Sequence, residues 1–172
     1  MEKLLKGVIR DVPDFPKKGI IFKDLTPVFQ NKKVFKKLIG YFYKKFKNRK
    51  IDKIVCVEAR GFLIGAPLAY KLGAGLIPVR KPGKLPRETY KVEYELEYGK
   101  DALEIHKDAI NEGDKILIID DLLATGGTVS AVAQLVEKSK GKIEAIAFIV
   151  ELDFLKGREK LNKYKIFSIV HY

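Results

Sequence analysis

The chain has little of what builds disulfide scaffolds and zinc sites. Its 172 residues include one cysteine, two histidines and no tryptophan. A lone cysteine cannot form an internal disulfide, and Cys56 lies in the apolar run 54–57, so we expect a buried thiol in a reducing compartment. His106 and His171 lack the spacing to cysteine or to each other that a zinc site needs. We interpret both histidines as structural or incidental.

Long apolar runs are also missing. No run approaches the length of about eighteen residues that a membrane span needs, and the first ten residues lack the apolar core of a signal peptide. The composition, 47% hydrophobic and 33% charged, is typical of a globular chain. We therefore expect one cytoplasmic domain, residues 1–172, with no membrane partner.

Acidic residues are scarce relative to basic ones. Aspartate and glutamate number 22 against 34 lysines and arginines, which gives a net charge of +12. A basic chain can bind nucleic acid, but here the lysines are spread along the whole sequence and only six residues are arginine. Positive charge also attracts a polyanionic small molecule. We expect an anionic small-molecule substrate and no nucleic-acid partner.

The most informative stretch is KILIIDDLLATGGT, residues 115–128. Ile116–Ile119 is a short apolar run with no polar alternation, which predicts a parallel strand buried on both faces. Asp120 and Asp121 follow it. In a parallel α/β sheet, ligands bind in the crevice beyond the carboxyl ends of the strands. The two carboxylates could therefore hold sugar hydroxyls or a hydrated Mg²⁺ ion there.

A small, glycine-rich loop comes next and opens a helix predicted over residues 129–138. Its residues are Ala124, Thr125, Gly126, Gly127 and Thr128. Such a loop can point several backbone N–H groups at one phosphate, and the helix dipole adds positive potential. Taken alone, the pattern also fits an ordinary buried strand that ends in a polar turn. A Walker B strand would need a P-loop, and the chain has no such motif.

A second strand–loop–helix of the same design is predicted earlier in the chain. Residues 51–57 form the strand, residues 58–61 (Glu-Ala-Arg-Gly) the loop and residues 62–72 the helix. Arginine can chelate phosphate oxygens at two points, so Arg60 suits a diphosphate. The alternative is an ordinary turn in which Arg60 pairs with Glu58.

Residues 80–87, RKPGKLPR, are basic and broken by proline and glycine. The apolar residues 92, 94, 96 and 98 then alternate with charged ones, as in a two-faced strand. A basic segment joined to such a ribbon is typical of a mobile flap, about residues 80–100, that closes over an anionic substrate. A surface hairpin with solvated lysines is the alternative.

The remaining segments complete an α/β pattern. Residues 1–30 form an N-terminal cap, broken by prolines and carrying a short strand, and residues 34–46 repeat apolar side chains at helical spacing. Further strands are predicted over residues 76–79, 103–106, 143–151 and 166–170, with a possible helix start at 157–161. The expected fold is a central, mostly parallel sheet flanked by helices.

Several of these segments together resemble the adenine phosphoribosyltransferases, which have the type I phosphoribosyltransferase fold. The matching segments follow the family's order along nearly the whole chain: 14–16 with 19–24 (base recognition), 59–62 (diphosphate loop), 80–86 and 96–100 (the two ends of the flap), 120–128 (phosphoribosyl-diphosphate signature) and 155–161. Five matches in the same order are far more specific than any one alone.

The resemblance implies the reaction of adenine with 5-phosphoribosyl 1-diphosphate to give AMP and diphosphate, through an oxocarbenium-like transition state. It implies Mg²⁺ as cofactor, held mainly by the diphosphate and not directly by protein ligands. It also implies an N-terminal hood of about residues 1–30, a mobile flap and a homodimer. In that dimer Arg80 and the residues after it reach toward the neighbouring subunit's site, and the contact surface lies near Arg60 and residues 62–72.

The resemblance also assigns roles to individual residues. The phosphoribosyl-diphosphate site would comprise Arg60, Arg80, Lys81, Lys84, Asp120, Asp121, Ala124, Thr125, Gly126, Gly127 and Thr128. Glu97, Asp120 and Asp121 would be catalytic. Adenine would meet main-chain groups at Ile21, stack on Phe22 and lie near Lys23, which stands where some family members carry arginine. Lysine cannot make the same planar two-point contact.

Two alternatives remain from the sequence. A related enzyme specific for hypoxanthine, guanine or xanthine would share the fold, but such enzymes usually read the base from a C-terminal region. The segment 20–24 therefore favours adenine. A non-catalytic regulator that senses phosphoribosyl diphosphate would usually add a helix-turn-helix domain, for which 172 residues leave no room.

Overall fold

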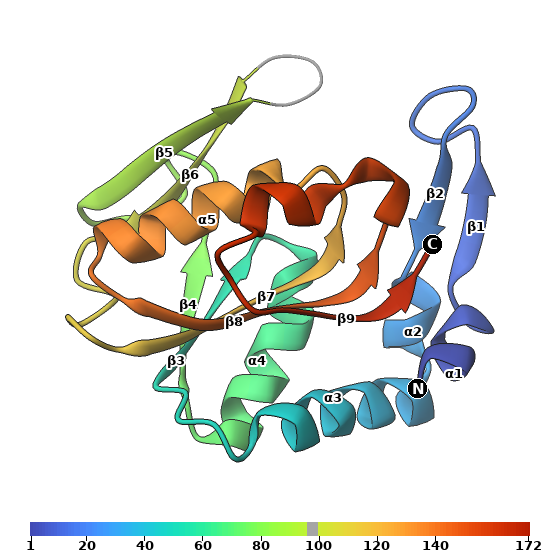
Figure 1. Ribbon diagram of the computed structural model, residues 1–172, viewed down its shortest axis with the longest axis horizontal. Coiled ribbons are helices and arrows are strands. Elements are labelled where there is room, and N and C mark those ends of the chain that lie inside the picture. Colours follow the sequence, from blue (N-terminus) through green and yellow to red (C-terminus); the bar gives the residue numbers. More distant parts are fainter. Residues whose placement is uncertain (96–99) are drawn as a thin grey trace.

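The computed structural model describes residues 1–95 and 100–172. A parallel sheet forms the centre of the fold (Figure 1), and the strands described in it run in the order β4-β3-β7-β8-β9 with parallel neighbours throughout. Their bounds are Lys53–Val57 (β3), Gly75–Val79 (β4), Lys115–Leu123 (β7), Lys142–Glu151 (β8) and Ile166–His171 (β9). The predicted α/β fold with a parallel sheet is confirmed.

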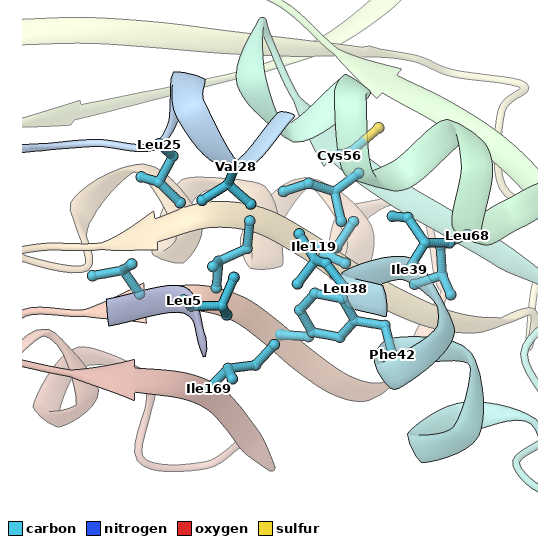
Figure 2. Packing of buried hydrophobic residues seen from close by; sticks show 14 of the residues in the cluster. Leu5, Leu25, Val28, Leu38, Ile39, Phe42, Cys56, Leu68, Ile119 and Ile169 are labelled. Carbon is cyan, nitrogen blue, oxygen red and sulfur yellow. The ribbon is translucent and has the colours of Figure 1, made fainter. Parts of the chain in front are cut away.

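Helices cover both faces of this sheet (Figure 1). Helices α3 (Lys32–Phe46) and α4 (Arg60–Leu72) lie on one face, and α5 (Gly127–Lys138) lies on the other. Figure 2 shows Phe42 of α3 and Leu68 of α4 packed with Ile119 of β7 on the first face. Cys56 belongs to the same buried cluster, as expected for a core thiol. The central strands β3, β7 and β8 are thus largely buried between helices.

Strand β7 is longer than its apolar run predicts. The four residues Ile116–Ile119 are fully buried, but the strand continues through both aspartates to Leu123 because pairing with β8 persists as far as Glu151. Pairing with β3 ends earlier, at Ile119 opposite Cys56. Beyond that point no strand of residues 1–95 or 100–172 pairs with the β3 side of β7, and this opens the crevice expected at the carboxyl ends.

Two antiparallel hairpins stand apart from the sheet (Figure 1). The N-terminal hairpin pairs β1 (Arg10–Pro13) with β2 (Ile21–Asp24), and the central hairpin pairs β5 (Thr89–Glu95) with β6 (Lys100–His106). They lie at opposite ends of the molecule. Buried Leu103 and Ile105 anchor the central hairpin in the cluster that contains α5. Glu97 lies outside the described residues.

The shorter elements are α1 (Glu2–Lys6), α2 (Thr26–Gln30) and two 3₁₀ turns, η1 (Asp153–Leu155) and η2 (Gly157–Leu161). The possible helix start at residues 157–161 is therefore a 3₁₀ turn, preceded by Lys156 in the left-handed conformation. Among the described residues, every helix is too short or too polar to cross a membrane.

Candidate active site

A pocket of about 270 Å³ opens at the carboxyl ends of β3 and β7. The side chains and loops that line it come from separate parts of the sequence: Val57–Arg60, Lys81, Tyr94, Leu103 and residues 120–129. It therefore brings together Arg60, Lys81, both aspartates and the whole loop 124–128. Arg80, Lys84 and the N-terminal hairpin are not part of its lining.

The loop 124–128, called here the cradle, contains one position, Gly126, that requires glycine. Gly126 has a φ of +78° and precedes α5, and a Cβ atom there would lie 2.5 Å from the carbonyl oxygen of Gly157. Because the first N–H groups of a helix have no intrahelical acceptor, the cradle offers several donors at the positive end of the helix dipole. Such an arrangement binds phosphate-like anions.

The two aspartates both line the pocket next to the cradle residues. Asp121 is only 4% exposed, and its Oδ2 atom lies 2.7 Å from Nε of Arg60. Asp120 accepts a hydrogen bond from the N–H of Asp121 at 2.9 Å and sits so close to Gly61 that a Cβ there would lie 3.1 Å from its Oδ1 atom. This pairing concentrates acidic oxygens at the mouth of the crevice.

The surroundings raise the pKa values of both carboxyl groups. Burial raises the pKa of Asp120 well above 3.8, and the neighbouring charge of Asp121 adds to the shift. Burial also raises the pKa of Asp121, although the charge of Arg60 opposes that shift. A cation or a set of hydroxyl groups placed beside the pair would favour the ionised forms. Perturbed acids in a crevice are typical of a functional site.

Arg60 links this acid pair to the N-terminal hairpin. Its guanidinium carbon lies 5.5 Å from the centre of the Phe22 ring, so the ring borders the pocket through Arg60 although it does not line it. Arg60 pairs with Asp121, which makes the alternative pairing with Glu58 wrong. Glu58 instead binds Nε of Arg80 at 2.7 Å. The Glu58–Ala59 peptide bond in this loop is cis.

The basic segment after β4 is held by carboxylates within the same chain. Burial raises the pKa of Glu58, but hydrogen bonds from Arg80 and from the N–H of Lys81 outweigh it and lower the pKa overall. Lys81 pairs with Asp101 of β6 at 3.0 Å. The carbonyl of Lys84 accepts a longer hydrogen bond from Arg80, at 3.4 Å. Positive charge is thus collected at the pocket rim, with carboxylates beside it.

Tyr94 lines the pocket, although it was predicted only as part of the flap and not as a site residue. It lies on β5, its hydroxyl is 3.5 Å from Asp101, and its ring would be 3.6 Å from a Cβ atom on Gly127. Burial raises the pKa of its hydroxyl, while a hydrogen bond with Thr128 opposes the shift. Alternation placed Tyr94 on one face of a ribbon, but only the packing of that face against α5 brings it to the cradle.

The expected base-recognition residues lie on β2. Ile21 is 57% exposed, and the half-buried Phe22 ring meets Phe15 edge-on with 5.2 Å between the ring centres. The Lys23 amine lies 2.8 Å from Asp11 and 3.9 Å from the centre of the Tyr172 ring. Since successive side chains of a strand point to opposite faces, Lys23 is turned away from the face that Phe22 presents.

Comparison with known proteins identifies the family. Residues 25–171 match the family model of the phosphoribosyl transferase domain. The adenine phosphoribosyltransferase of Thermoanaerobacter pseudethanolicus is 58% identical over 168 residues, which cover 98% of this chain and 97% of that protein.

Solved structures agree with the sequence match. A crystal structure of the adenine phosphoribosyltransferase from Thermoanaerobacter pseudethanolicus has a TM-score of 0.96 at 56% identity and covers 100% of both chains. The Saccharomyces cerevisiae enzyme, crystallised with adenine and an imino-altritol bisphosphate, has a TM-score of 0.93 at 46% identity, covering 98% of this chain and 97% of that one. The resemblance seen in the motifs is confirmed, and the chain belongs to the phosphoribosyltransferase family and, within it, to the adenine phosphoribosyltransferases.

Proposed function

We propose that the pocket at the ends of β3 and β7 is where this adenine phosphoribosyltransferase converts adenine and 5-phosphoribosyl 1-diphosphate into AMP and diphosphate. The position of Arg60 is the observation that carries the proposal. Its side chain lies 2.7 Å from Asp121 on the cradle side and 5.5 Å from the Phe22 ring on the hairpin side. The Arg60 guanidinium therefore lies between the proposed sites for the phosphoribosyl group and for the base.

The cradle would hold the 5′-phosphate of the substrate on its backbone N–H groups. The ribose would then lie over Asp120 and Asp121, whose oxygens accept hydrogen bonds from the 2′ and 3′ hydroxyls. As the bond to diphosphate breaks, positive charge develops on the ribose ring. The two carboxylates favour that charge because they are fixed before the reaction begins.

The leaving diphosphate would be neutralised by Arg60 and Lys81, with Arg80 and Lys84 nearby on the same turn. Each of the first three is now paired with a carboxylate: Asp121, Asp101 and Glu58 respectively. Bound Mg²⁺ would supply further neutralisation of the diphosphate. Hard cations of this kind prefer oxygen ligands, which the diphosphate would mainly supply, and the half-buried Asp120 carboxylate at the pocket suits the water molecules of a hydrated ion.

Adenine would be recognised by main-chain groups at Ile21 while its ring stacks on Phe22, with Lys23 contributing through its backbone. An N–H and C=O pair suits the N1 acceptor and 6-amino donor of adenine. A 6-oxopurine would leave those groups unpaired, which costs affinity. Glu97, which lies outside the described residues, is proposed to assist at the reacting centre. Replacing it with glutamine would then lower kcat by roughly 10²–10⁴-fold.

A panel of bases tests the proposal. Purified protein with 5-phosphoribosyl 1-diphosphate and Mg²⁺ should form AMP from adenine, with one diphosphate released per AMP. Hypoxanthine, guanine and xanthine should react at least about 10³-fold more slowly, because mismatched polar groups stay unpaired. Equal turnover of hypoxanthine would contradict the base assignment. Binding of 5-phosphoribosyl 1-diphosphate without turnover of any base would favour the regulator.

Assembly and organisation extend the proposal. We propose a homodimer that uses the surface of α4 and β4, where Leu63, Tyr70 and Leu76 are large apolar side chains exposed to 48%, 90% and 41%. Light scattering should give twice the chain mass, and Tyr70→Lys should shift it toward one. A monomer with full activity would contradict the dimer.

Residues 1–30 would act as the hood and residues 80–100 as the flap. The single buried Cys56 suits a cytoplasmic setting.

A further inference from the structure

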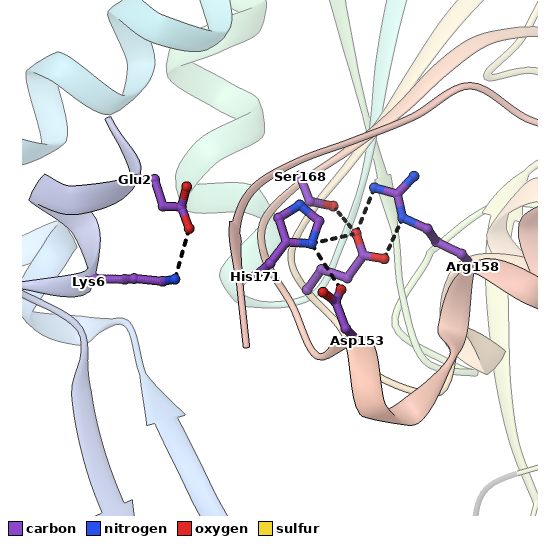
Figure 3. A network of polar contacts seen from close by, with 7 residues as sticks. Glu2, Lys6, Asp153, Arg158, Ser168 and His171 are labelled. Atoms are coloured by element: carbon purple, nitrogen blue, oxygen red, sulfur yellow. Dashed lines mark hydrogen bonds and ion pairs between the residues drawn. The ribbon is translucent and has the colours of Figure 1, made fainter.

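An ion pair between a buried carboxylate and an exposed arginine, Glu151 and Arg158, lies outside the pocket at the end of β8. Glu151 is only 3% exposed. Arg158 of η2 donates to it from Nε at 2.5 Å and from Nη2 at 2.8 Å, and the Ser168 hydroxyl donates at 2.5 Å (Figure 3). A two-point arginine–carboxylate pair fixes direction as well as distance. Arg158 is therefore tied to the sheet in one orientation.

The residue next to Arg158 touches the cradle. A Cβ atom on Gly126 would lie 2.5 Å from the carbonyl oxygen of Gly157, and a Cβ atom on Gly157 would collide with the carbonyl oxygen of Ala124. The N–H of Leu152 donates to the carbonyl of Leu123, at the point where the cradle begins, at 2.9 Å. The two segments thus meet backbone against backbone. Any displacement of Gly157 would reach the cradle directly.

Other contacts hold the two ends of the segment, because the N–H of Asp153 donates to the carbonyl of Tyr172 at 2.9 Å and Leu161 is fully buried, so the Arg158 ion pair fixes its middle. Residues 153–161 form two short 3₁₀ turns, and turns of this kind have poor hydrogen-bond geometry and rarely persist alone. His171 and Asp153 complete a group with Glu151 whose ligand atoms lie within 4.8 Å of one another. A metal ion there would have to displace Arg158 from Glu151. The geometry therefore favours the arginine as the partner of this carboxylate.

We propose that Glu151 and Arg158 are positioning residues for the phosphate cradle. Their ion pair holds Gly157 against Gly126 and so keeps the cradle N–H groups aligned with a 5′-phosphate. Neither residue lines the pocket, so both act through the backbone of the segment between them. This inference rests on the proposed role of residues 124–128 as the phosphate site.

The test compares AMP with adenosine, because the two ligands differ only in the phosphate. Calorimetry on the full chain should show that Arg158→Met weakens AMP binding by about tenfold to a hundredfold, the range known for outer partners of metal sites. Adenosine binding should change less than about twofold. The KM for 5-phosphoribosyl 1-diphosphate should rise while the KM for adenine stays nearly constant. Arg158→Lys, which keeps the charge, should lose less.

A matched control removes a neighbouring ion pair that does not touch the cradle. Lys163 pairs with Glu137 of α5 at 2.9 Å, and both side chains are exposed. Lys163→Met should leave both ligand affinities unchanged. If Arg158→Met fails to fold, Arg158→Lys carries the same comparison.

Two results would overturn the inference. An unchanged AMP affinity in the Arg158 variants would refute the positioning role alone, provided that the wild-type protein prefers AMP. Equal weakening of both ligands would do the same, because it would indicate a merely structural role. If the wild-type protein itself bound adenosine as tightly as AMP, the cradle would not be the phosphate site, and the proposed function would fail first.

Discussion

The cradle and the N-terminal hairpin lie on either side of Arg60 but are built by opposite means. The cradle follows β7, whose residues Ile116–Ile119 are fully buried, and Gly157 packs against the cradle backbone. The N-terminal hairpin has two short strands, with Ile21 57% exposed at the start of β2. A site that stabilises developing charge needs donors and carboxylates fixed in advance. A site for a flat base needs one ring face and a few main-chain groups.

This contrast separates the expected effects of substitution. Changes in the cradle should disturb stability and every phosphate-bearing ligand together, because backbone packing and ligand binding use the same atoms. Changes in the hairpin should alter adenine binding with little effect on stability. The predictions below test this division, beginning with the largest expected effect.

Gly126→Val should abolish cradle function. The substitution places a branched side chain at a φ of +78° and against the Gly157 carbonyl, so the cradle backbone has to move. We expect kcat/KM to fall by about 10³-fold or more, since more than one donor to the phosphate is lost, and the melting temperature to fall as well. Steady-state kinetics and thermal unfolding measure the two effects.

A control isolates the cost of the backbone conformation. Gly113 has a φ of +83° and nothing within 4 Å of its would-be Cβ atom. Gly113→Val should therefore lower the melting temperature through strain while leaving turnover nearly intact. Normal turnover in Gly126→Val would remove the cradle from the site.

Asp120→Asn should lower activity but raise stability. Burial and Asp121 raise the pKa of Asp120 above its unfolded value of 3.8, so the folded chain binds this proton more tightly than the unfolded chain does. The stabilising contribution of Asp120 to the free energy of unfolding is therefore fully present below pH 3.8, and it is lost as the pH rises through the pKa that Asp120 has in the folded chain. Asparagine imitates the protonated form. The variant should melt higher than wild type at pH 7, and the gain should shrink toward pH 4.

The activity of the same variant should move the other way. Loss of one preorganised charge beside the ribose should reduce kcat by about tenfold to a hundredfold. Thermal unfolding across pH and kcat at pH 7 give the two readouts. A variant that is both less stable and fully active would place Asp120 among ordinary structural residues.

Phe22→Ala tests the hairpin side of the contrast. Phe22 is half-buried and packs edge-on against Phe15, so it is not a central core residue. Loss of stacking on a base costs about 1–3 kcal/mol by analogy with single-strand binders, which predicts a KM for adenine about tenfold to a hundredfold higher. The KM for 5-phosphoribosyl 1-diphosphate should stay constant. A stability loss of about 3–5 kcal/mol with unaltered adenine KM would instead identify a core residue.

Some parts of the fold and of the site could be predicted from the sequence, and others could not. Strands β3, β7, β8 and β9 contain apolar runs, and the loop after β7 is rich in glycine, so these strands and a crevice at the carboxyl end of β7 could be predicted. The end of β7 could not, because Asp120 and Asp121 interrupt the apolar pattern while backbone pairing with β8 continues. The pattern of apolar residues predicts which side chains are buried, but it does not predict where the backbone pairing of two strands ends.

Contacts between side chains that are far apart in the sequence could not be predicted either. Whether Arg60 pairs with Glu58 or with Asp121 depends on how α4 lies against β7, and the structure alone decides for Asp121. Tyr94 reaches the cradle because the central hairpin packs on α5. The pair of Glu151 and Arg158 forms across a turn in which Lys156 is left-handed and Gly157 lies against the cradle backbone. Each of these contacts depends on tertiary packing. The residue pattern within one segment does not predict which distant segment it will contact.

Lys23→Met is expected to have the smallest effect, and it tests whether the hairpin reads adenine with side chains or with its backbone. The Lys23 amine is engaged by Asp11 at 2.8 Å and lies 3.9 Å from the centre of the Tyr172 ring, on the face of β2 opposite Phe22. Its removal should cost about 0.5–1 kcal/mol of stability, as for a partly exposed ion pair and cation–π contact. The KM for adenine should change by less than about twofold, because the lysine side chain makes no contact with the base in this arrangement. A lost direct contact worth about 1.4 kcal/mol would instead raise that KM about tenfold. Asp11→Asn is the matched control, because it removes the same ion pair and keeps the lysine. A tenfold rise in the adenine KM for Lys23→Met, with none for Asp11→Asn, would show that the lysine side chain turns to meet the base.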